Sequence, residues 1–244
     1  FLDRIMVQFL AGTEILLGLL GDDRLDAAVP LSTVNLDERL DAYGVVHADA
    51  LGWESIHLDL DGAALDAAAR RRLVAAIDRD VIETGFVRAD GRVATTLHPQ
   101  PGPTGAAGPF AARPGEEGEG EKVEASGDLT MAAASGDELT TLVQRVMQTQ
   151  LTSAGFDVEL VRVEPSTFYG PWVRDDPTDA AVRRRAGAPG LVDAPGALGS
   201  LKAWPLLHVE TVIAWQVGLH GLEPNPTLEG PLWNADNWWK DSGS

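Results

Sequence analysis

The sequence predicts an α/β protein in which a mixed sheet is flanked by helices. Segments in which apolar and polar residues alternate recur along the chain, as in half-buried strands. Between two of them lies a stretch with apolar residues at helical spacing. The apolar content of 44% and the charged content of 23% are those of an ordinary globular protein. A chain of 244 residues can form one large domain or two small ones.

The first part of the chain alternates between strand and helix patterns. In its longest alternating segment Ile56, Leu58 and Leu60 share one side, so we expect His57 to face outward as a surface residue. Gly21 and Gly85 are placed to end the two helices. The expected elements are a strand over 4–9, a helix over 13–20, a strand over 24–29, a strand over 53–60 and a helix over 63–84.

The clearest unit comes later in the chain. A strand is expected over 128–134, followed by a helix whose apolar stripe runs from Leu139 to Leu151. Gly155 falls where a helix commonly ends in a left-handed residue, and a strand over 156–160 follows. Strand, helix and strand at these lengths predict a right-handed parallel crossover. Residues 206–215 predict a further, apolar strand, in which His208 is expected to be a core residue.

Residues 99–124 differ from the rest in composition. They are rich in proline and glycine and contain the run Gly-Glu-Glu-Gly-Glu-Gly-Glu over 115–121. Such a composition favours an exposed loop or linker whose glutamates are solvated. We therefore divide the chain into a first α/β segment over 1–98, this linker, and a C-terminal α/β lobe over 125–244 that ends in a tryptophan-rich tail.

Charge and composition exclude several functions. The formal net charge of −18 repels phosphate backbones and anionic lipid surfaces, so we expect no nucleic-acid partner. With no cysteine there is no disulfide, thiolate metal site or cysteine nucleophile. No apolar run is long enough to span a bilayer. Because the chain starts at Phe1 without an initiator methionine, we expect it to begin inside a longer natural protein.

Catalytic signatures are missing from the sequence. It has no phosphate-binding glycine loop and no Gly-x-Ser-x-Gly nucleophile motif. The five histidines are scattered, without the spacing of a metal site. We therefore expect no catalytic residue, no metal and no cofactor. One alternative stays open, a hydrolase or transferase in which Asp175 and Asp176 do general acid–base work.

The segment over 169–177 is the best candidate for ligand binding in the middle of the chain. It brings Trp172, Arg174 and Asp175 close together in a loop with prolines on both sides. Arginine can bind a carboxylate, aspartate an ammonium group and tryptophan an apolar body, so the set suits a zwitterionic ligand. The alternative is a surface loop in which Arg174 pairs locally. We interpret the following run Arg183-Arg184-Arg185 as a solvated helix face.

Five of the seven tryptophans fall in the tract from 204 to 239. Such a cluster marks either a core seam or a binding surface, because each indole combines a large apolar area with one N–H. Trp204 and Trp215 flank the apolar strand and are expected to pack in the core. Trp233, with its neighbour Asn234, is expected to contact ligand, while Trp238 and Trp239 are expected to be exposed.

Several segments resemble the extracytoplasmic solute-binding proteins of ABC transporters, of the family 5 type that includes oligopeptide, dipeptide and nickel binders. The matching segments occur in family order over most of the chain: Gly21 to Asp26, Leu73 to Ile82 with the sequence Ala-Ile-Asp-Arg, Leu142 to Leu160, Pro205 to Trp215, and Pro231 to Asn234 with Trp238. The family's chains are about twice this length, and the matches belong to their C-terminal half. The stretch between Arg185 and Trp204 is shorter than in the family.

The resemblance implies a fold and a function. The fold would be a lobe of the type II periplasmic-binding-protein kind, with 1–98 completing the first lobe and beginning the C-terminal one. The function would be capture of a peptide-like or similar small solute between two closing lobes, and its delivery to ABC permease subunits, without catalysis. The missing N-terminal lobe of the same protein would be a partner. The location would be extracytoplasmic, periplasmic or anchored as a bacterial lipoprotein. A regulatory module that reuses the lobe without transport stays open as an alternative.

Overall fold

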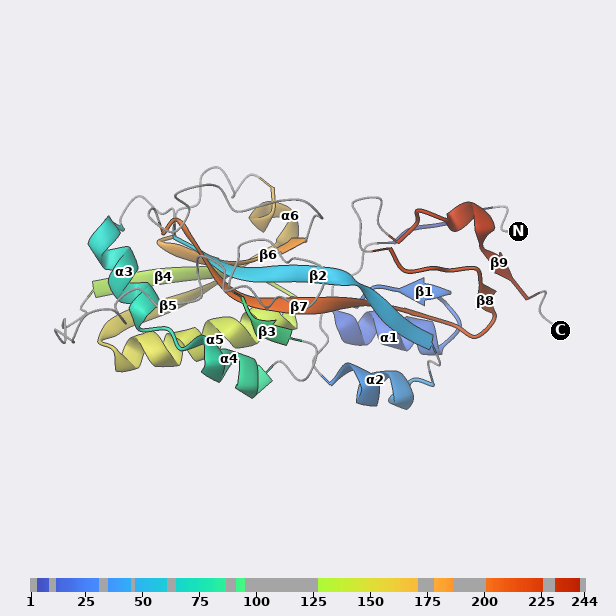
Figure 1. Cartoon of the computed structure of the whole chain (residues 1–244), viewed down its shortest axis with the longest axis horizontal. Helices are drawn as coiled ribbons and strands as arrows, with labels where there is room; N and C mark the ends of the chain where they lie inside the picture. Colours follow the sequence, from blue (N-terminus) through green and yellow to red (C-terminus); the bar gives the residue numbers. More distant parts are fainter. Residues whose placement is uncertain are drawn as a thin grey trace.

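Two long antiparallel strands, β2 (His47–Asp59) and β7 (Ala203–Trp215), organise the fold. The computed structural model describes residues 4–8, 12–30, 35–44, 47–60, 65–86, 91–94, 127–170, 178–186, 201–225 and 231–241. The described strands form a seven-stranded mixed sheet in the order β1-β7-β2-β6-β4-β5, with β3 also paired to β7. Figure 1 shows β2 and β7 running side by side through the middle of an elongated molecule, with helices gathered at both ends. The predicted α/β class is confirmed.

One end of the molecule, which we call the α1–α2 half, is built by the start of the chain. It contains α1 (Thr13–Gly21), β1 (Ala27–Ala28) and α2 (Leu36–Ala42). Leucines of α1 and α2 are buried around Ala214 of β7, which makes a separate apolar core. The helix predicted over 13–20 is confirmed, and the strand predicted over 24–29 is reduced to two residues.

The strand predicted at the start of the chain is wrong for the residues described there. Residues 4–8 have no sheet partner within the described part of the chain. Ile5, Met6 and Val7 are 40%, 66% and 54% exposed. Alternation alone cannot make a strand, because the backbone N–H and C=O groups need a neighbouring strand to bond with.

The other end, which we call the α5 half, contains the parallel strands. β4 (Gly127–Ala134) and β5 (Phe156–Val163) pair in parallel and are joined by α5 (Glu138–Ser153), as predicted. The Asp137 side chain caps α5 by accepting the Thr140 N–H at 3.2 Å. Gly155, with φ of +97°, follows the helix in the left-handed conformation expected at that position.

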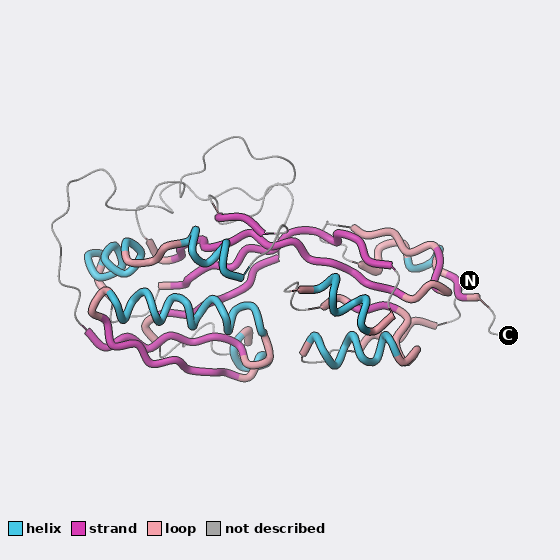
Figure 2. Tube along the Cα trace, turned by 90° about the horizontal axis from the view of Figure 1, so that it is seen from below, coloured by secondary structure: helices cyan, strands magenta, loops and turns pink. Residues whose placement is uncertain are grey.

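The sheet of the α5 half is covered on both faces. β6 (Ala180–Ala186) pairs in parallel with β4 and antiparallel with β2. One face carries the main core, where residues of α5 bury Leu129, Met131 and Ala133 of β4. Figure 2, seen from below, shows helices lying over this face. On the opposite face Phe168 of α6 (Pro165–Phe168) packs against Ala132, Ala134 and Ala181, whose small side chains let α6 approach closely.

The helix predicted over 63–84 is two helices, α3 (Ala67–Ala75) and α4 (Arg79–Phe86). The break falls at Asp78, whose Oδ1 accepts the N–H groups of Asp80 at 3.0 Å and Val81 at 3.3 Å and so begins α4. The buried Arg79 donates to the carbonyl oxygens of Ala94, just after β3 (Gly91–Val93), and of Pro205 in β7. The Ala-Ile-Asp-Arg segment is therefore part of the core that joins α4 to β7.

The end of the chain returns to the α1–α2 half. There β8 (Leu219–His220) and β9 (Trp239–Lys240) form a two-stranded sheet, and a 3-10 turn lies over Ala235–Asn237. None of the helices in the described ranges has the length and apolar character needed to cross a membrane. The main sheet takes strands from both sides of the predicted linker over 99–124, which lies outside the described residues. The three-part division of the chain stays a prediction.

Candidate functional site

The connections that follow β4 and β5 leave the sheet on opposite faces. α5 follows β4 on the face of the main core, and α6 follows β5 on the other face. In open α/β sheets, ligands bind outside the carboxyl ends of parallel strands at such a divergence. The residues at this place, which we call the carboxyl edge, are Ser135, Asp137 and Glu138 after β4 and Glu164 after β5. The Ser135 N–H donates to the carbonyl of Val163 at 2.7 Å, which holds the two strand ends together.

Beside this edge, Arg184 of β6 lies between two carboxylates, those of Glu54 and Asp137. Its Nε lies 2.6 Å from Glu54 Oε2, and its Nη1 lies 3.5 Å from Asp137 Oδ2. Only 11% of its side chain is exposed. Burial alone would lower the pKa of the Arg184 guanidinium, but Glu54 and Asp137 outweigh it and raise that pKa. Arg184 therefore joins β2, β6 and the start of α5 as a fixed, compensated cation.

Tyr169 presents an aromatic ring next to these charges. It is 46% exposed, and its ring packs edge-on against the buried Phe168 ring, with centroids 5.1 Å apart. Burial of the phenol, followed by the nearby Asp137 charge, raises the pKa of Tyr169. The neutral phenol can offer an O–H and an apolar ring face to a ligand at the carboxyl edge.

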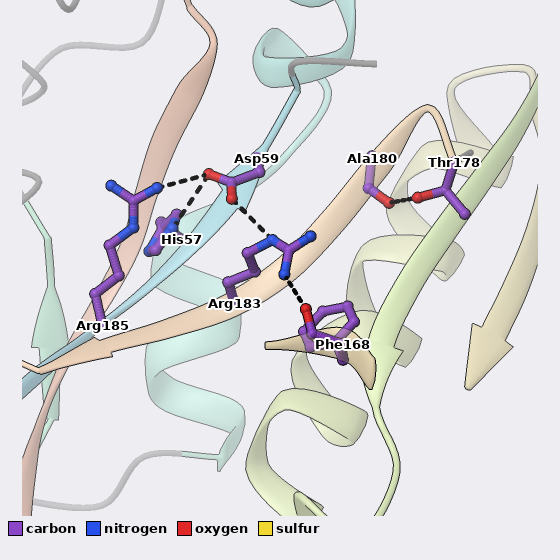
Figure 3. Close-up of polar contacts among 7 residues, drawn as sticks. All are labelled: His57, Asp59, Phe168, Thr178, Ala180, Arg183 and Arg185. Carbon is purple, nitrogen blue, oxygen red and sulfur yellow. Dashed lines mark hydrogen bonds and ion pairs between the residues drawn. The ribbon is translucent and has the colours of Figure 1, made fainter. Parts of the chain in front are cut away.

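A second polar cluster lies on the sheet face that α6 covers (Figure 3). Asp59 Oδ2 lies 3.0 Å from Arg183 Nε, and Asp59 Oδ1 lies 3.2 Å from His57 Nε2 and 3.4 Å from Arg185 Nη2. Burial alone would raise the pKa of Asp59, but the adjacent His57, Arg185 and Arg183 lower it overall. Arg183 also donates to the Phe168 carbonyl at 2.9 Å and lies over the Phe168 ring.

Two predictions about this cluster are wrong. His57 does alternate away from Ile56 and Leu58, but it is 0% exposed, because alternation gives the face of a strand and not what covers that face. The run Arg183-Arg184-Arg185 is part of strand β6 and not a helix face. Three acidic side chains balance the positive charges of these arginines. Asp59 pairs with Arg183 and Arg185 on one face of β6, and Glu54 and Asp137 pair with Arg184 on the other.

The described residues on both sides of the loop predicted to bind ligand are held by hydrogen bonds. Before it, the α6 end is held by Arg183. After it, Asp179 pairs with Thr130 of β4: its carboxylate accepts the Thr130 N–H at 2.8 Å, and its own N–H donates to the Thr130 carbonyl at 3.1 Å. The Thr178 hydroxyl donates to the Ala180 carbonyl at 3.1 Å (Figure 3). Trp172, Arg174 and Asp175 themselves, like the alternative acid Asp176, lie outside the described residues.

Trp233 and Asn234, the other predicted ligand residues, lie in the α1–α2 half, away from the carboxyl edge (Figure 1). Trp233 is 45% exposed, and its indole N–H donates to the Glu223 carbonyl at 2.9 Å. Asn234 is buried: its Nδ2 donates to the Gly221 carbonyl and its Oδ1 accepts from Trp238 Nε1, both at 2.8 Å. The amide of Asn234 therefore holds the tail together.

The other tryptophans divide between core and surface. Trp204 is 0% exposed and Trp215 packs beside a small apolar cluster, which confirms their predicted packing roles. The expected exposure of Trp238 is wrong: it is 5% exposed, because Ile213, Leu219 and Leu222 cover it. Trp239 is 44% exposed, as expected, and stacks on His220 with ring centroids 4.0 Å apart.

Sequence reasoning missed Glu54, Asp137, Tyr169 and Arg184 as neighbours. One signal was available, because Asp137 stands where an N-cap is expected before the helical stripe that begins at Leu139. The others meet only because β2, β6 and β4 pair side by side. No group of three or more potential metal ligands occurs among the described histidines, aspartates and glutamates.

Comparison with known proteins gives structural neighbours only. No protein-family model matches the chain, and no curated protein matches it by sequence. The structure of the oligopeptide-binding protein AppA from Bacillus subtilis, in complex with a nonapeptide, matches with a TM-score of 0.73 at 14% identity. The match covers 95% of this chain and 59% of AppA.

Two further structures match almost as well. The dipeptide-binding protein from a Pseudoalteromonas species, in complex with Met-Leu, has a TM-score of 0.70 at 15% identity over 94% of this chain and 57% of that one. NikZ from Campylobacter jejuni, in complex with Ni(L-His), has a TM-score of 0.70 at 14% identity over 94% of this chain and 60% of that one. The chain thus spans somewhat under two thirds of the proteins that it matches. The chain has the fold of the family 5 solute-binding proteins of ABC transporters, the family that its sequence resembles.

Proposed function

We propose that the chain is the C-terminal part of a solute-binding subunit of an ABC importer, which captures a peptide-like or similar small solute without catalysis. One observation carries the proposal. The carboxyl edge, where open α/β sheets bind ligands, ends at Glu138, and Glu138 lies 3.2 Å from Arg39 of the other half. The carboxyl edge therefore faces the α1–α2 half, which supports a site between two closing lobes.

The solved neighbours support the class of ligand. Those proteins hold a nonapeptide, the dipeptide Met-Leu and a nickel–histidine complex, all of which carry amino and carboxylate groups. Among the described residues the carboxyl edge offers the carboxylates of Glu138 and Glu164, and Tyr169 presents its phenol beside it. Carboxylates suit the ammonium group of such a solute, and an aromatic ring suits its side chain.

The proposed contacts combine the predicted residues with this edge. Trp172, Arg174 and Asp175 are kept as proposed contacts, and Arg174 would bind the carboxylate of the solute. The described residues on either side of them, Phe168 and Asp179, are bonded to Arg183 and Thr130. Trp233 offers an exposed ring. Asn234 would act through Trp238 and Gly221, which its amide holds. Tyr169 is the contact that we add.

The remaining parts of the proposal concern partners and place. The proteins that the chain matches are longer, so an N-terminal lobe of the same protein would complete the site. The complete subunit would deliver solute to permease subunits. It would act outside the cytoplasmic membrane, either in the periplasm or as an anchored lipoprotein.

Calorimetric titration tests the proposal. A version extended to include the N-terminal lobe is titrated with short peptides, amino-acid–metal chelates, opines and sugars, beside the chain alone. We expect at least one zwitterionic solute to bind the extended version with micromolar or tighter affinity. Replacing Tyr169 by alanine should weaken that binding at least about tenfold, whereas Val81→Ala, which removes an exposed apolar side chain of α4, should not. Absence of binding across the whole panel would overturn the proposal.

A further inference from the structure

The two halves of the molecule have separate apolar cores. The core of the α1–α2 half gathers leucines of α1 and α2 around Ala214, and the core of the α5 half gathers residues of α5 around Ile56 and Leu207. Both cores rest on the β2–β7 pair, which runs from one to the other (Figure 1). The pairing of these strands shifts register between Ala50 and Gly52, which is a bulge that bends a strand.

Among the described residues, Arg39 reaches from one half to the other outside the strands. Arg39 lies on α2 between Leu36 and Leu40, which are buried in the core of the α1–α2 half. Its Nη1 lies 3.2 Å from Oε2 of Glu138, the first residue of α5. Figure 2 shows the helices of both halves on the same side of the β2–β7 pair, which agrees with this contact.

Arg39 is also bound firmly within its own half. Its Nη2 lies 2.6 Å from Oε1 of Glu14 on α1, and Glu14 in turn accepts the Tyr43 hydroxyl at 2.8 Å. The hydrogen bond from Tyr43 and the nearby Arg39 charge lower the pKa of Glu14, against the effect of burial. The Arg39 side chain, which is 15% exposed, is thus oriented by Glu14 where it meets Glu138.

We propose that Arg39 is an ionic latch between the two halves. Arg39 stays bound to Glu14 and forms or breaks its ion pair with Glu138. The ion pair stabilises the arrangement described here. It is lost in arrangements where the β2–β7 pair bends and α2 separates from α5. Glu138 suits the role because an acid in the first turn of a helix is stabilised by the helix dipole and lies at the carboxyl edge. Because Glu138 and Glu14 are 49% and 60% exposed, salt weakens the latch.

Distance measurements between the halves test the latch. The chain has no cysteine, so the exposed positions Asp22 in the α1–α2 half and Thr152 in α5 can be changed to cysteine and spin-labelled. Double electron–electron resonance on Arg39→Gln and on Glu138→Gln should show the ratio of separated to closed molecules raised about two- to fivefold. The double variant should match either single one, and molar salt should move the parent protein toward the variants.

A matched control separates the latch from a general loss of charge. Lys240 forms an exposed ion pair with Asp26 at 2.6 Å, and both belong to the α1–α2 half. Lys240→Gln should leave the distance distribution unchanged. Circular dichroism checks folding, and Glu138→Gln keeps the test valid if Arg39→Gln unfolds the α1–α2 half. Unchanged distances in Glu138→Gln, or an equal shift in Lys240→Gln, would overturn the latch.

The inference adds to the proposed closing of two lobes on a solute, but its test uses no solute. If the distances shift while the extended protein binds nothing in the calorimetric panel, the latch stands and the proposed function fails. If a solute binds while the distances in Glu138→Gln stay unchanged, the proposed function stands and the latch fails.

Discussion

Gln150 of α5 brackets the backbone of Asp78, the residue that separates α3 from α4. Its side-chain oxygen accepts the Asp78 N–H at 2.9 Å, and its Nε2 donates to the Asp78 carbonyl at 3.1 Å. The two residues are 72 positions apart and belong to two of the segments that resemble the binding-protein family. A shared structural need, the junction between two helices and α5, accounts for both resemblances without a role in ligand binding.

Replacing Gln150 by leucine should therefore destabilise the fold by about 2–3 kcal/mol, because both Asp78 backbone groups lose their partner. Gln148, on the same helix α5, makes a single hydrogen bond, to the Val158 carbonyl of β5. Gln148→Leu is therefore the graded control and should cost about 1 kcal/mol. Urea denaturation followed by circular dichroism measures both. Equal losses in the two variants would contradict the bracketing role of Gln150.

Acid should weaken the contact between β2 and β6. The folded-state pKa of Asp59 lies below its usual value, despite its burial, because His57, Arg185 and Arg183 favour the carboxylate. The stabilisation is complete well above the pKa of Asp59 in the unfolded chain, which is about 4, and is lost as the pH falls from there through the lower folded-state pKa. Asp59→Asn should flatten the fall in unfolding free energy over that range, whereas Asp157→Asn, on the exposed side of β5, should keep it.

Arg183 and Arg185 offer a matched pair of arginines on one strand face. Arg183 is 7% exposed and bonds both Asp59 and the Phe168 carbonyl, so Arg183→Met should cost about 2–4 kcal/mol. Arg185 contacts the same carboxylate but its side chain is 45% exposed, and Arg185→Met should cost less than about 1 kcal/mol. Guanidinium denaturation measures the unfolding free energy of both variants. Similar losses of stability would refute the dual role of Arg183.

The sequence was most informative where its signals are local. The β4–α5–β5 unit was predicted correctly, because alternation, an apolar stripe and Gly155 all act within a few residues. The strand predicted over 4–9 failed because strand formation needs a partner elsewhere in the chain. The arginine run over 183–185 was assigned to a helix because three like residues in a row carry no period.

The carboxyl edge lay beyond such signals. Glu54, Asp137 and Arg184 belong to β2, the start of α5 and β6, and they meet only through the strand order β2-β6-β4. Neighbouring strands here are far apart in sequence, so pairing order depends on long-range contacts that periodicity does not encode. The predicted residues Trp172, Arg174 and Asp175 were found through local composition, and their contacts with a solute stay a prediction.

Gly221 gives the sharpest test of how the tryptophan tail is held. Its φ is +78°, and a Cβ built on it would collide with the Asn237 carbonyl oxygen, which belongs to the backbone just before the buried Trp238. Gly44 has a similar φ of +67° but open space around its Cβ position. Gly44→Ala should therefore cost only the left-handed backbone strain, about 1 kcal/mol.

Gly221→Ala should cost about 2 kcal/mol more, because the backbone must move and Asn234 must loosen its hold on the Gly221 carbonyl and on Trp238. Denaturation curves measure the difference between the two alanine variants. Near-ultraviolet circular dichroism should show a loss of tryptophan signal in Gly221→Ala alone, because Trp238 becomes mobile when the β8–β9 sheet loosens. Equal stability of the two variants would mean that the tail adapts around residue 221, and that close backbone packing there does not fix Trp238.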